Sequence, residues 1–494
     1  MEERKGFGTN FGFLMAAVGS AVGLGNIWGF PNKMGASGGF TFLVIYLVLA
    51  VLCGFIVMVG ELALGRKTRH GAVGAYKALS KKFKWMGWMG ILSAFFILFF
   101  YCALGGYCIK YTVLNIGDLF HAGFGANALA ETAAANGNSL GAEVFGAFMS
   151  SPTEAIVFGL IFVAITMIIV IGGIGGGIEK GGGIEKVCSV GMPALFVMLL
   201  ICIVRACTLE GAVDGLKYMF VPGWAVANGV IEEAPGFLTV LSTAGGQMFF
   251  SLSLGMGAMI TYGSYLDKKE NLQKNALLII IMDTLVALMA GLCVIPGRFA
   301  LDPTGNLGGP KLLFVTMQNV FSRMGGFGPI FGILFYLLVV FAAVSSSISL
   351  LEVIVAHFVD KARNEGKGDM RKKYTFIAAA AVGVGCILVC ADRLGDASFT
   401  PWKLLNLPAE SIRTWNDCWL DFWDMLSEGI MMPLGALLMS LMFGWEVGTD
   451  VVKEECEASG HAMGSYGFFK VCIKYITPLI MILILYGQIK EFFF

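Results

Sequence analysis

Long apolar segments separated by short polar stretches run through the whole chain. Each segment has about 20 residues or more, which is the length of a helix that spans the ~30 Å hydrocarbon core of a bilayer. We therefore expect an all-α integral membrane protein. The pattern predicts eleven spans, at about 10–34, 39–65, 87–115, 154–175, 187–207, 239–265, 275–297, 327–358, 373–391, 421–445 and 465–489.

The composition agrees with this pattern. Of the 494 residues, 57% are hydrophobic and only 14% are charged, and the mean hydropathy is +0.78. Soluble domains carry about a quarter charged residues, so a cytosolic enzyme and a secreted disulfide scaffold are excluded. The formal net charge of zero implies no nucleic acid partner. The 12 cysteines contain no CxxC pair and the 4 histidines are scattered, so the sequence indicates no zinc or redox centre.

The distribution of Lys and Arg predicts the orientation in the membrane. Both are frequent in the loops at 66–84, 268–274 and 361–373, whereas 118–153 contains neither. Because cytoplasmic loops carry the excess of positive residues, we expect the N-terminus in the cytoplasm and, after eleven spans, the C-terminus outside. The expected location is the inner (plasma) membrane of the cell, with the lipid bilayer as a partner. The oligomeric state is not predicted.

The first and sixth spans do not have the sequence of continuous helices. Gly19–Asn26 and Ser251–Gly257 each place several Gly and polar residues at mid-membrane, and an interior Gly costs a helix about 1 kcal/mol relative to Ala. For a single span of this kind, close packing of helices through small residues explains the glycines equally well. Two such interrupted spans, at corresponding positions in the two halves of the chain, instead indicate the central binding site of a transporter. We expect one transporter domain, 1–494, made of an inverted repeat of five plus five spans and an appended eleventh helix, with boundaries 1–208, 209–447 and 448–494.

Several motifs resemble the signatures of the neurotransmitter:sodium symporter family. They are Gly19-Ser-Ala-Val-Gly-Leu-Gly-Asn-Ile-Trp-Gly-Phe-Pro31, Gln247-Met-Phe-Phe-Ser-Leu-Ser-Leu-Gly-Met-Gly-Ala258, Gly183-Ile-Glu-Lys186 with Met192-Pro193, Asp283-Thr-Leu-Val286 and Ser345-Ser-Ser347. The resemblance implies the LeuT-type fold with unwound spans 1 and 6, in a bacterial eleven-span amino-acid branch. It further implies a sodium-coupled symporter, not an enzyme, that takes up a neutral L-amino acid by alternating access.

The resemblance implies two sodium ions. The first site maps onto the Ala21 carbonyl, the Asn26 amide oxygen, Ser251 and Asp283. The second maps onto the carbonyls of Gly19, Val22 and Ala342 and the hydroxyls of Ser345 and Ser346. From spacing alone, serines within a span more often bond to their own helix. A carboxylate in mid-span costs about 2.5–3.5 kcal/mol on insertion scales, which favours a functional Asp283. Chloride-dependent relatives have a neutral residue there, so we expect no chloride requirement.

The substrate residues also follow from the resemblance. The carboxylate is expected at the first sodium ion, the Leu24 and Gly25 amides and the Tyr101 hydroxyl, and the amino group at carbonyls near Ala21, Phe250 and Ser253. The predicted set carries no charge, so a hydrophobic or aromatic amino acid is expected. Without the resemblance, the helical spacing of Met256 would assign this residue to the apolar core. The whole set is Ala21, Leu24, Gly25, Ile97, Tyr101, Phe250, Ser251, Ser253, Met256, Ser346, Ser349 and Leu350.

Two gates are implied on either side of that site. Arg4 and Asp360 match the inner gate pair, with Tyr265 as a brace. Phe250 and Tyr101 match the lid over the substrate. At the outer gate Asp424 is present, but Gly29 stands where the family has an arginine. Lys33 lies one helical turn further out, and we expect it to reach Asp424 instead, either directly or through water.

Other functions remain open at this point. A proton-coupled or sodium-independent amino-acid permease would have the same fold. A membrane receptor that senses the substrate without moving it is an alternative outside transport. A membrane-embedded enzyme would need a set of polar catalytic groups at one depth, and the spans contain only carboxylates that the ion sites account for.

Overall fold

The computed structural model describes residues 9–173, 183–303, 309–406 and 417–493, and within these ranges every regular element is a helix. The helices are α1 (Asn10–Ala21), α2 (Phe30–Ala36), α3 (Phe40–Leu49), α4 (Phe55–Thr68), α5 (Ala72–Leu79), α6 (Met86–Leu119), α7 (Ala130–Asn136), α8 (Leu140–Met149), α9 (Pro152–Ile171), α10 (Ile184–Cys207), α11 (Ala212–Phe220), α12 (Trp224–Ala227), α13 (Phe237–Ser251), α14 (Ala258–Gly263), α15 (Leu272–Leu301), α16 (Met317–Ser322), α17 (Gly328–Asn364), α18 (Arg371–Ala391), α19 (Pro401–Leu405), α20 (Trp419–Asp424), α21 (Met432–Leu441), α22 (Asp450–Glu457), α23 (Tyr466–Val471) and α24 (Thr477–Phe493). Short π-helical turns join several of them, as at Gly25–Gly29 between α1 and α2.

The spans agree with the sequence pattern. Among the described residues, 9 helical segments are long and apolar enough to cross a membrane, and α1 with the helix from Gly25 to Ala36 makes a tenth that is bent by 46°. The predicted sixth segment is occupied by α13 and α14, which a non-helical stretch separates. The prediction of an all-α membrane protein with broken first and sixth spans is therefore confirmed. The boundaries of the two repeats stay a prediction.

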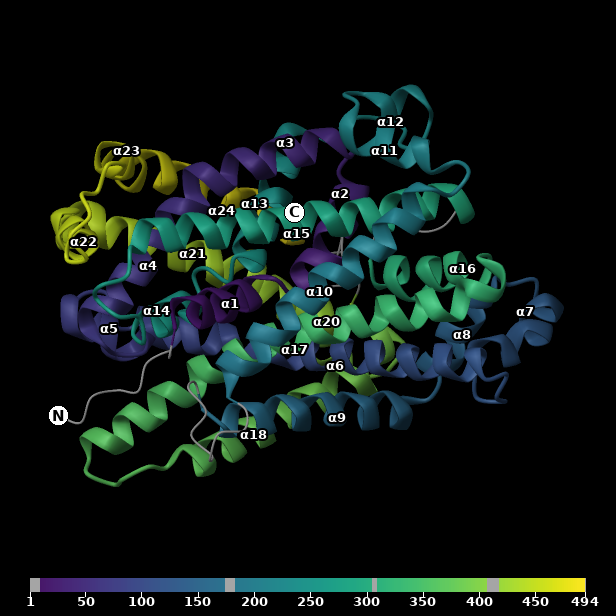
Figure 1. The fold of residues 1–494 in the computed structure, drawn as a ribbon, viewed down its shortest axis with the longest axis horizontal. Coiled ribbons are helices and arrows are strands. Elements are labelled where there is room, and N and C mark those ends of the chain that lie inside the picture. The colour runs from purple at the N-terminus through teal and green to yellow at the C-terminus, as the bar shows by residue number, and fades with distance from the viewer. Residues whose placement is uncertain (1–8, 174–182, 304–308, 407–416, 494) are drawn as a thin grey trace.

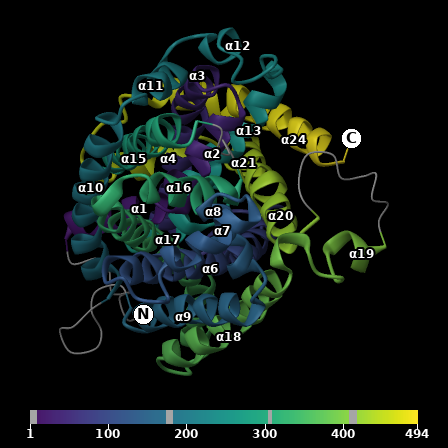
Figure 2. The same ribbon diagram turned by 90° about the vertical axis from the view of Figure 1, so that its right-hand side faces the viewer.

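Long helices surround the broken ones. α6 and α17 lie side by side along the length of the molecule, and α9 and α18 pack on the far side of α6 (Figure 1). α1 packs against α10, α15 and α17, while α13 packs against α3 and α24. Figure 2 looks onto the end of the bundle that carries α7, α8, α11 and α16, which the charge pattern predicts to be the outer end.

Local backbone conformation explains both breaks. In the first, α1 ends at Ala21, because the next residue, Val22, has an extended backbone (φ −73°, ψ 99°) that leaves the helical region. In the sixth, Gly255 and Gly257 have φ of +80° and +79°, which residues with a side chain rarely adopt. A Cβ at Gly255 would also lie 2.3 Å from the Met432 carbonyl oxygen. The Gly255 N–H donates to Glu61 Oε1 (2.7 Å), so this buried carboxylate of α4 holds the unwound backbone.

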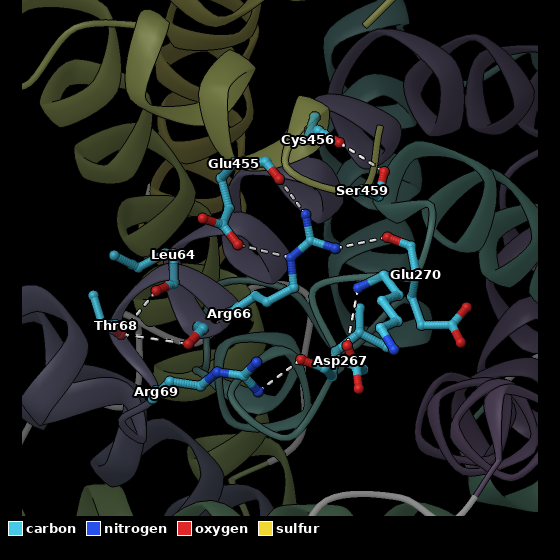
Figure 3. A network of polar contacts seen from close by, with 12 residues as sticks. Leu64, Arg66, Thr68, Arg69, Asp267, Glu270, Glu455, Cys456 and Ser459 are labelled. Atoms are coloured by element: carbon cyan, nitrogen blue, oxygen red, sulfur yellow. Dashed lines mark hydrogen bonds and ion pairs between the residues drawn. The ribbon is translucent and has the colours of Figure 1, made fainter. Parts of the chain in front are cut away.

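A buried arginine connects distant parts of the chain at the predicted inner end (Figure 3). Arg66 of α4 is fully buried, and its Nε donates to Glu455 Oε1 of α22 (2.8 Å). Its other nitrogens donate to the carbonyl oxygens of Glu455 and of Glu270, the latter at 2.7 Å. Close by, Arg69 Nη1 donates to the Leu266 carbonyl (2.7 Å). The second span, the loop before α15 and the segment after the tenth span are thus joined by one guanidinium group.

Candidate functional site

A small cavity lies where the two broken spans face each other. Its walls come from α1 and the break after it, from α6, from the sixth-span break and from α17. Only about 10 Å³ of it is open to the centre of a water molecule, which is room for about one water. We call it the central cavity. The lining residues are Ser20, Ala21, Gly23, Gly25, Ile97, Tyr101, Phe250, Ser253, Met256, Ser346 and Leu350.

Polar groups lie on one side of the central cavity. The Leu24 N–H donates to the Tyr101 hydroxyl (2.9 Å). The Ser253 hydroxyl donates to the Ser20 carbonyl (2.8 Å), so the two breaks are linked directly. Gly23 has no side chain, and a Cβ there would lie 2.2 Å from Ser346 Oγ and 2.3 Å from the Tyr101 oxygen. The position therefore keeps backbone and hydroxyl groups accessible to a polar head group.

The opposite side is apolar. Ile97, Phe250, Met256 and Leu350 form it, and no charged side chain lines the cavity. The Phe250 and Tyr101 rings lie with their centroids 6.4 Å apart. An uncharged pocket with a polar end fits a molecule with a polar head and an apolar side chain.

Most of the residues predicted for substrate line this cavity, and three do not. Leu24 reaches it only through its N–H bond to Tyr101. Ser251 is turned toward Asp283. Ser349 donates to the Ser346 carbonyl (2.7 Å) and accepts from the Ser20 hydroxyl (2.7 Å), so it lies behind the wall.

Asp283 is the centre of the first predicted ion site. It is fully buried, and Ser251 Oγ donates to both of its oxygens (3.0 and 2.9 Å). Asn26 Nδ2 donates to Asp283 Oδ1 (2.7 Å), while Asn26 Oδ1 accepts the Gly23 N–H (3.0 Å). The amide thus turns its nitrogen toward the carboxylate, whereas an ion at this point requires its oxygen. Rotation of the Asn26 amide would turn its oxygen toward the carboxylate. All the groups at this point would then be oxygens, which are the ligands that a hard cation prefers.

The structure brings together all five groups of the second predicted ion site. Ser345 Oγ donates to the carbonyls of Ala342 (2.9 Å) and Val22 (3.3 Å). Ser346 Oγ lies 3.2 Å from the Gly19 carbonyl oxygen and 3.0 Å from that of Ser20. The cluster contains neutral oxygens from α1 and α17. Such a set fits Na⁺, a hard cation that unwound carbonyls coordinate in transporters of this architecture.

At the predicted inner end, the structure reveals an ion pair that the sequence did not predict. Glu352 of α17 is fully buried, and Arg371 at the start of α18 contacts both of its oxygens. The Tyr265 hydroxyl donates to Glu352 Oε1 (2.9 Å). Asp360 accepts the Gly71 N–H (3.3 Å). Arg4, the predicted gate partner of Asp360, lies outside the described residues.

The outer end requires a correction. Lys33 makes its ion pair with Glu428, one turn beyond Asp424, so the direct Lys33–Asp424 pair is wrong, while a contact through water stays a prediction. Beside Gly29 the space is occupied by the end of the Gln247 side chain, with Oε1 2.7 Å from where a Cβ would lie. Gln247 Nε2 also donates to the Gly25 carbonyl (2.6 Å). Asp424 and Glu428 line one cavity with Lys33.

Sequence reasoning missed three side chains that matter here. Tyr46 of α3 contacts Asp283 Oδ2 (3.3 Å) and Ser251 Oγ (3.4 Å). A single tyrosine in an apolar span does not by itself indicate a binding site, so the sequence did not single it out. Glu428 is a carboxylate inside the tenth span, which was a usable signal. Arg371 was counted only as a loop charge.

Comparison with known proteins agrees with this geometry. The model of the sodium:neurotransmitter symporter family matches residues 4–121 and 152–401. A protein of Bacillus subtilis (strain 168), named uncharacterized sodium-dependent transporter YhdH, is 32% identical over 490 residues, 96% of each chain. An uncharacterized sodium-dependent transporter of Haemophilus influenzae is 30% identical over 495 residues, 98% of each chain.

A solved structure is similar over the same length. The crystal structure of MhsT in complex with L-phenylalanine has a TM-score of 0.81 and 30% identity, and the alignment covers 98% of this chain and 100% of MhsT. Both the family match and the structural match include the broken helices and the residues around them. The chain therefore belongs to the sodium:neurotransmitter symporter family and has the LeuT-type fold.

Proposed function

We propose that the protein is a symporter that couples sodium entry to uptake of a hydrophobic or aromatic neutral L-amino acid, without a requirement for chloride. The observation that carries this proposal is the uncharged central cavity between the two breaks, with a polar end at Tyr101 and Leu24 and an apolar end at Met256. The similarity to MhsT, which was crystallised with L-phenylalanine, supports the same substrate class. One charge entering down 100 mV supplies about 2.3 kcal/mol for uptake.

Uptake into proteoliposomes tests the proposal. Radiolabelled L-phenylalanine and L-leucine are expected to accumulate under an inward sodium gradient and not when choline replaces sodium. Replacement of chloride by gluconate should leave uptake unchanged. Uptake that persists in choline would favour a sodium-independent or proton-coupled permease. Saturable binding without accumulation would favour a sensor.

We assign the carboxylate of the substrate to the polar end of the cavity, where the Leu24 and Gly25 amides begin the next helical turn and attract negative charge. The amino group is assigned to the Ala21, Phe250 and Ser253 carbonyls. Because the cavity has room for about one water, side chains must move outward when substrate enters. Phe250 and Tyr101 are the proposed lid.

The second sodium site yields a testable prediction. Ser345→Ala and Ser346→Ala should each raise the sodium concentration for half-maximal uptake by about tenfold, because each removes one oxygen ligand and ten-fold corresponds to about 1.4 kcal/mol. The measurement is uptake as a function of sodium concentration.

Ser347→Ala is the matched control for that series. Its hydroxyl bonds to Thr166 of α9 (2.8 Å) and to the Val344 carbonyl (3.0 Å), away from the break. If the sodium dependence of all three variants matched that of the wild type, the assignment of this site would be wrong.

We propose that Lys33 and Glu428 form the outer gate, beside Asp424, and that Arg4 and Asp360 form the inner one with Tyr265. Lys33→Ala should slow uptake severalfold and make a cysteine at Asp424 react faster with a membrane-impermeant thiol reagent, since the pair joins the first and tenth spans. The charge exchange Lys33→Glu with Glu428→Lys should recover part of both effects. Unchanged uptake and labelling in Lys33→Ala would refute the gate.

A further inference from the structure

A strongly basic segment lies between the second and third spans, at the predicted inner end. Residues 62–117 contain no Asp or Glu, whereas the other loops predicted to face the cytoplasm mix both signs of charge, as in Asp267-Lys-Lys-Glu270. α5 lies at the same end of the molecule as α14 and α22 (Figure 1). We call Lys77–Trp88, from the end of α5 to the start of α6, the basic segment. Its four lysines are all exposed: Lys77, Lys81, Lys82 and Lys84.

The lysines of the basic segment are not neutralised by carboxylates. None of the ion pairs between described residues includes one of these lysines. Lys67 of α4, by contrast, pairs with Glu454 of α22. Glu446, at the end of the tenth span, does reach the segment, but its Oε1 accepts the Ser80 hydroxyl (2.9 Å). The surface therefore keeps an excess of positive charge.

Exposed aromatic side chains lie at the α6 end of the basic segment. Trp85 and Trp88 are 49% and 46% exposed. Because Met86–Leu119 is long and apolar enough to span a membrane, these two indoles lie where the third span enters the bilayer at its predicted cytoplasmic surface. Tryptophan is enriched at that depth because its ring is apolar and its N–H is polar. The neighbouring lysines are therefore placed at the level of the lipid headgroups.

Several contacts hold the basic segment in a fixed shape. Ser80 Oγ accepts the Phe83 N–H (3.0 Å), which closes the turn after α5. The Trp88 ring meets the His357 ring of α17 edge to face, with centroids 4.7 Å apart. α5 itself packs against α4, α6, α14 and α17. A surface that is already ordered loses little conformational entropy when it binds a partner.

We propose that the basic segment binds the headgroups of anionic phospholipids in the cytoplasmic leaflet. Lysines clustered next to a spanning helix attract anionic lipid, and each lysine near the surface contributes roughly fivefold to binding. A soluble phosphate has no acyl chains and gains nothing from Trp85 and Trp88, so the expected ligand is a lipid. The segment contains none of the groups assigned to substrate or sodium, and binding of lipid is independent of the proposed transport.

Fluorescence quenching within the segment tests the proposal. Bimane attached to Ala78→Cys, an exposed position, reports on lipid there, since the native cysteines are buried apart from the partly exposed Cys207. The purified full-length protein in neutral detergent is titrated with phosphatidylglycerol or phosphatidylcholine that carries a nitroxide near the headgroup end of one acyl chain. Saturable quenching by phosphatidylglycerol is expected, with an association constant at least tenfold above that of phosphatidylcholine. Equal binding of the two lipids, or displacement of phosphatidylglycerol by soluble glycerophosphate, would overturn the proposal.

Two pairs of neighbouring lysines provide a matched comparison. Lys81→Gln with Lys82→Gln should lower the association constant for phosphatidylglycerol at least fivefold and leave that for phosphatidylcholine unchanged. Lys268→Gln with Lys269→Gln removes the same charge from the same predicted face, but these exposed lysines each lie next to a carboxylate in the sequence, so phosphatidylglycerol should bind as it does to the wild type. The proposal is wrong if the first pair of substitutions leaves binding unchanged, or if both pairs weaken it equally.

Discussion

Replacement of Arg371 by alanine should destabilise the protein by about 3–5 kcal/mol, because breaking a buried ion pair leaves its partner charge uncompensated. Glu352 is that partner, is fully buried, and receives two nitrogens from the guanidinium group. Arg371 Nε also donates to the Val170 carbonyl at the end of α9 (2.9 Å), so one side chain joins three helices. Thermal unfolding in detergent, with unfolding monitored by exposure of buried cysteines, measures the loss.

A second substitution should restore most of the stability that Arg371→Ala loses. Glu352→Gln in the Arg371→Ala background removes the uncompensated charge and should recover most of the stability, because the amide oxygen can still accept the bond from the Tyr265 hydroxyl. Lys372→Ala, at an exposed position next in sequence, is the control and should change little. If Arg371→Ala unfolded at the wild-type temperature, the pair would have no stabilising role.

The second large effect is expected at Asp283. Asp283→Asn keeps the size of the side chain but removes the negative charge from the first ion site, so sodium affinity should fall about 100-fold or more, equivalent to about 2.8 kcal/mol. If the carboxylate takes the place of a chloride ion, chloride should then stimulate uptake by the variant and not by the wild type. Tyr46 and Ser251 already surround this point with hydroxyl donors that suit an anion.

Uptake at several sodium and chloride concentrations measures both parts of that prediction. Asp283→Ala provides the control, because it leaves the donors of Ser251, Asn26 and Tyr46 without an acceptor and should be inactive with or without chloride. Chloride-stimulated uptake by the wild type would contradict the proposed chloride independence. Full activity of Asp283→Asn without chloride would show that the charge is not needed.

Much of the fold could be predicted from sequence because the bilayer imposes a simple rule. A lipid-exposed backbone must satisfy its hydrogen bonds internally, so an apolar segment of membrane-spanning length predicts a helix. Glycine-rich stretches such as Gly255–Gly257 predict where that helix is interrupted. The motifs also placed Ser345 and Ser346 beside the first span, where the structure has them, while their role as ion ligands stays a prediction.

The ends of the bundle were harder to predict. Lys33 was expected to reach Asp424, but a long flexible side chain can reach either of two carboxylates one turn apart, and its ion pair is with Glu428. Arg371 lies beside lysines in a polar stretch, so its sequence context is that of a solvated loop. Its burial depends on α9 and α17, which are distant in the chain.

The Arg66 network has a consequence for biosynthesis. Arg66 leaves the ribosome early, while the side chain that neutralises it, Glu455, is 389 residues further along the chain. During most of translation the guanidinium group must therefore remain hydrated at the predicted cytoplasmic face or be held by other partners. The Arg66 network forms only after the segment around α22 has been made. Chains that stop before residue 455 lack the carboxylate that neutralises Arg66 in the finished fold.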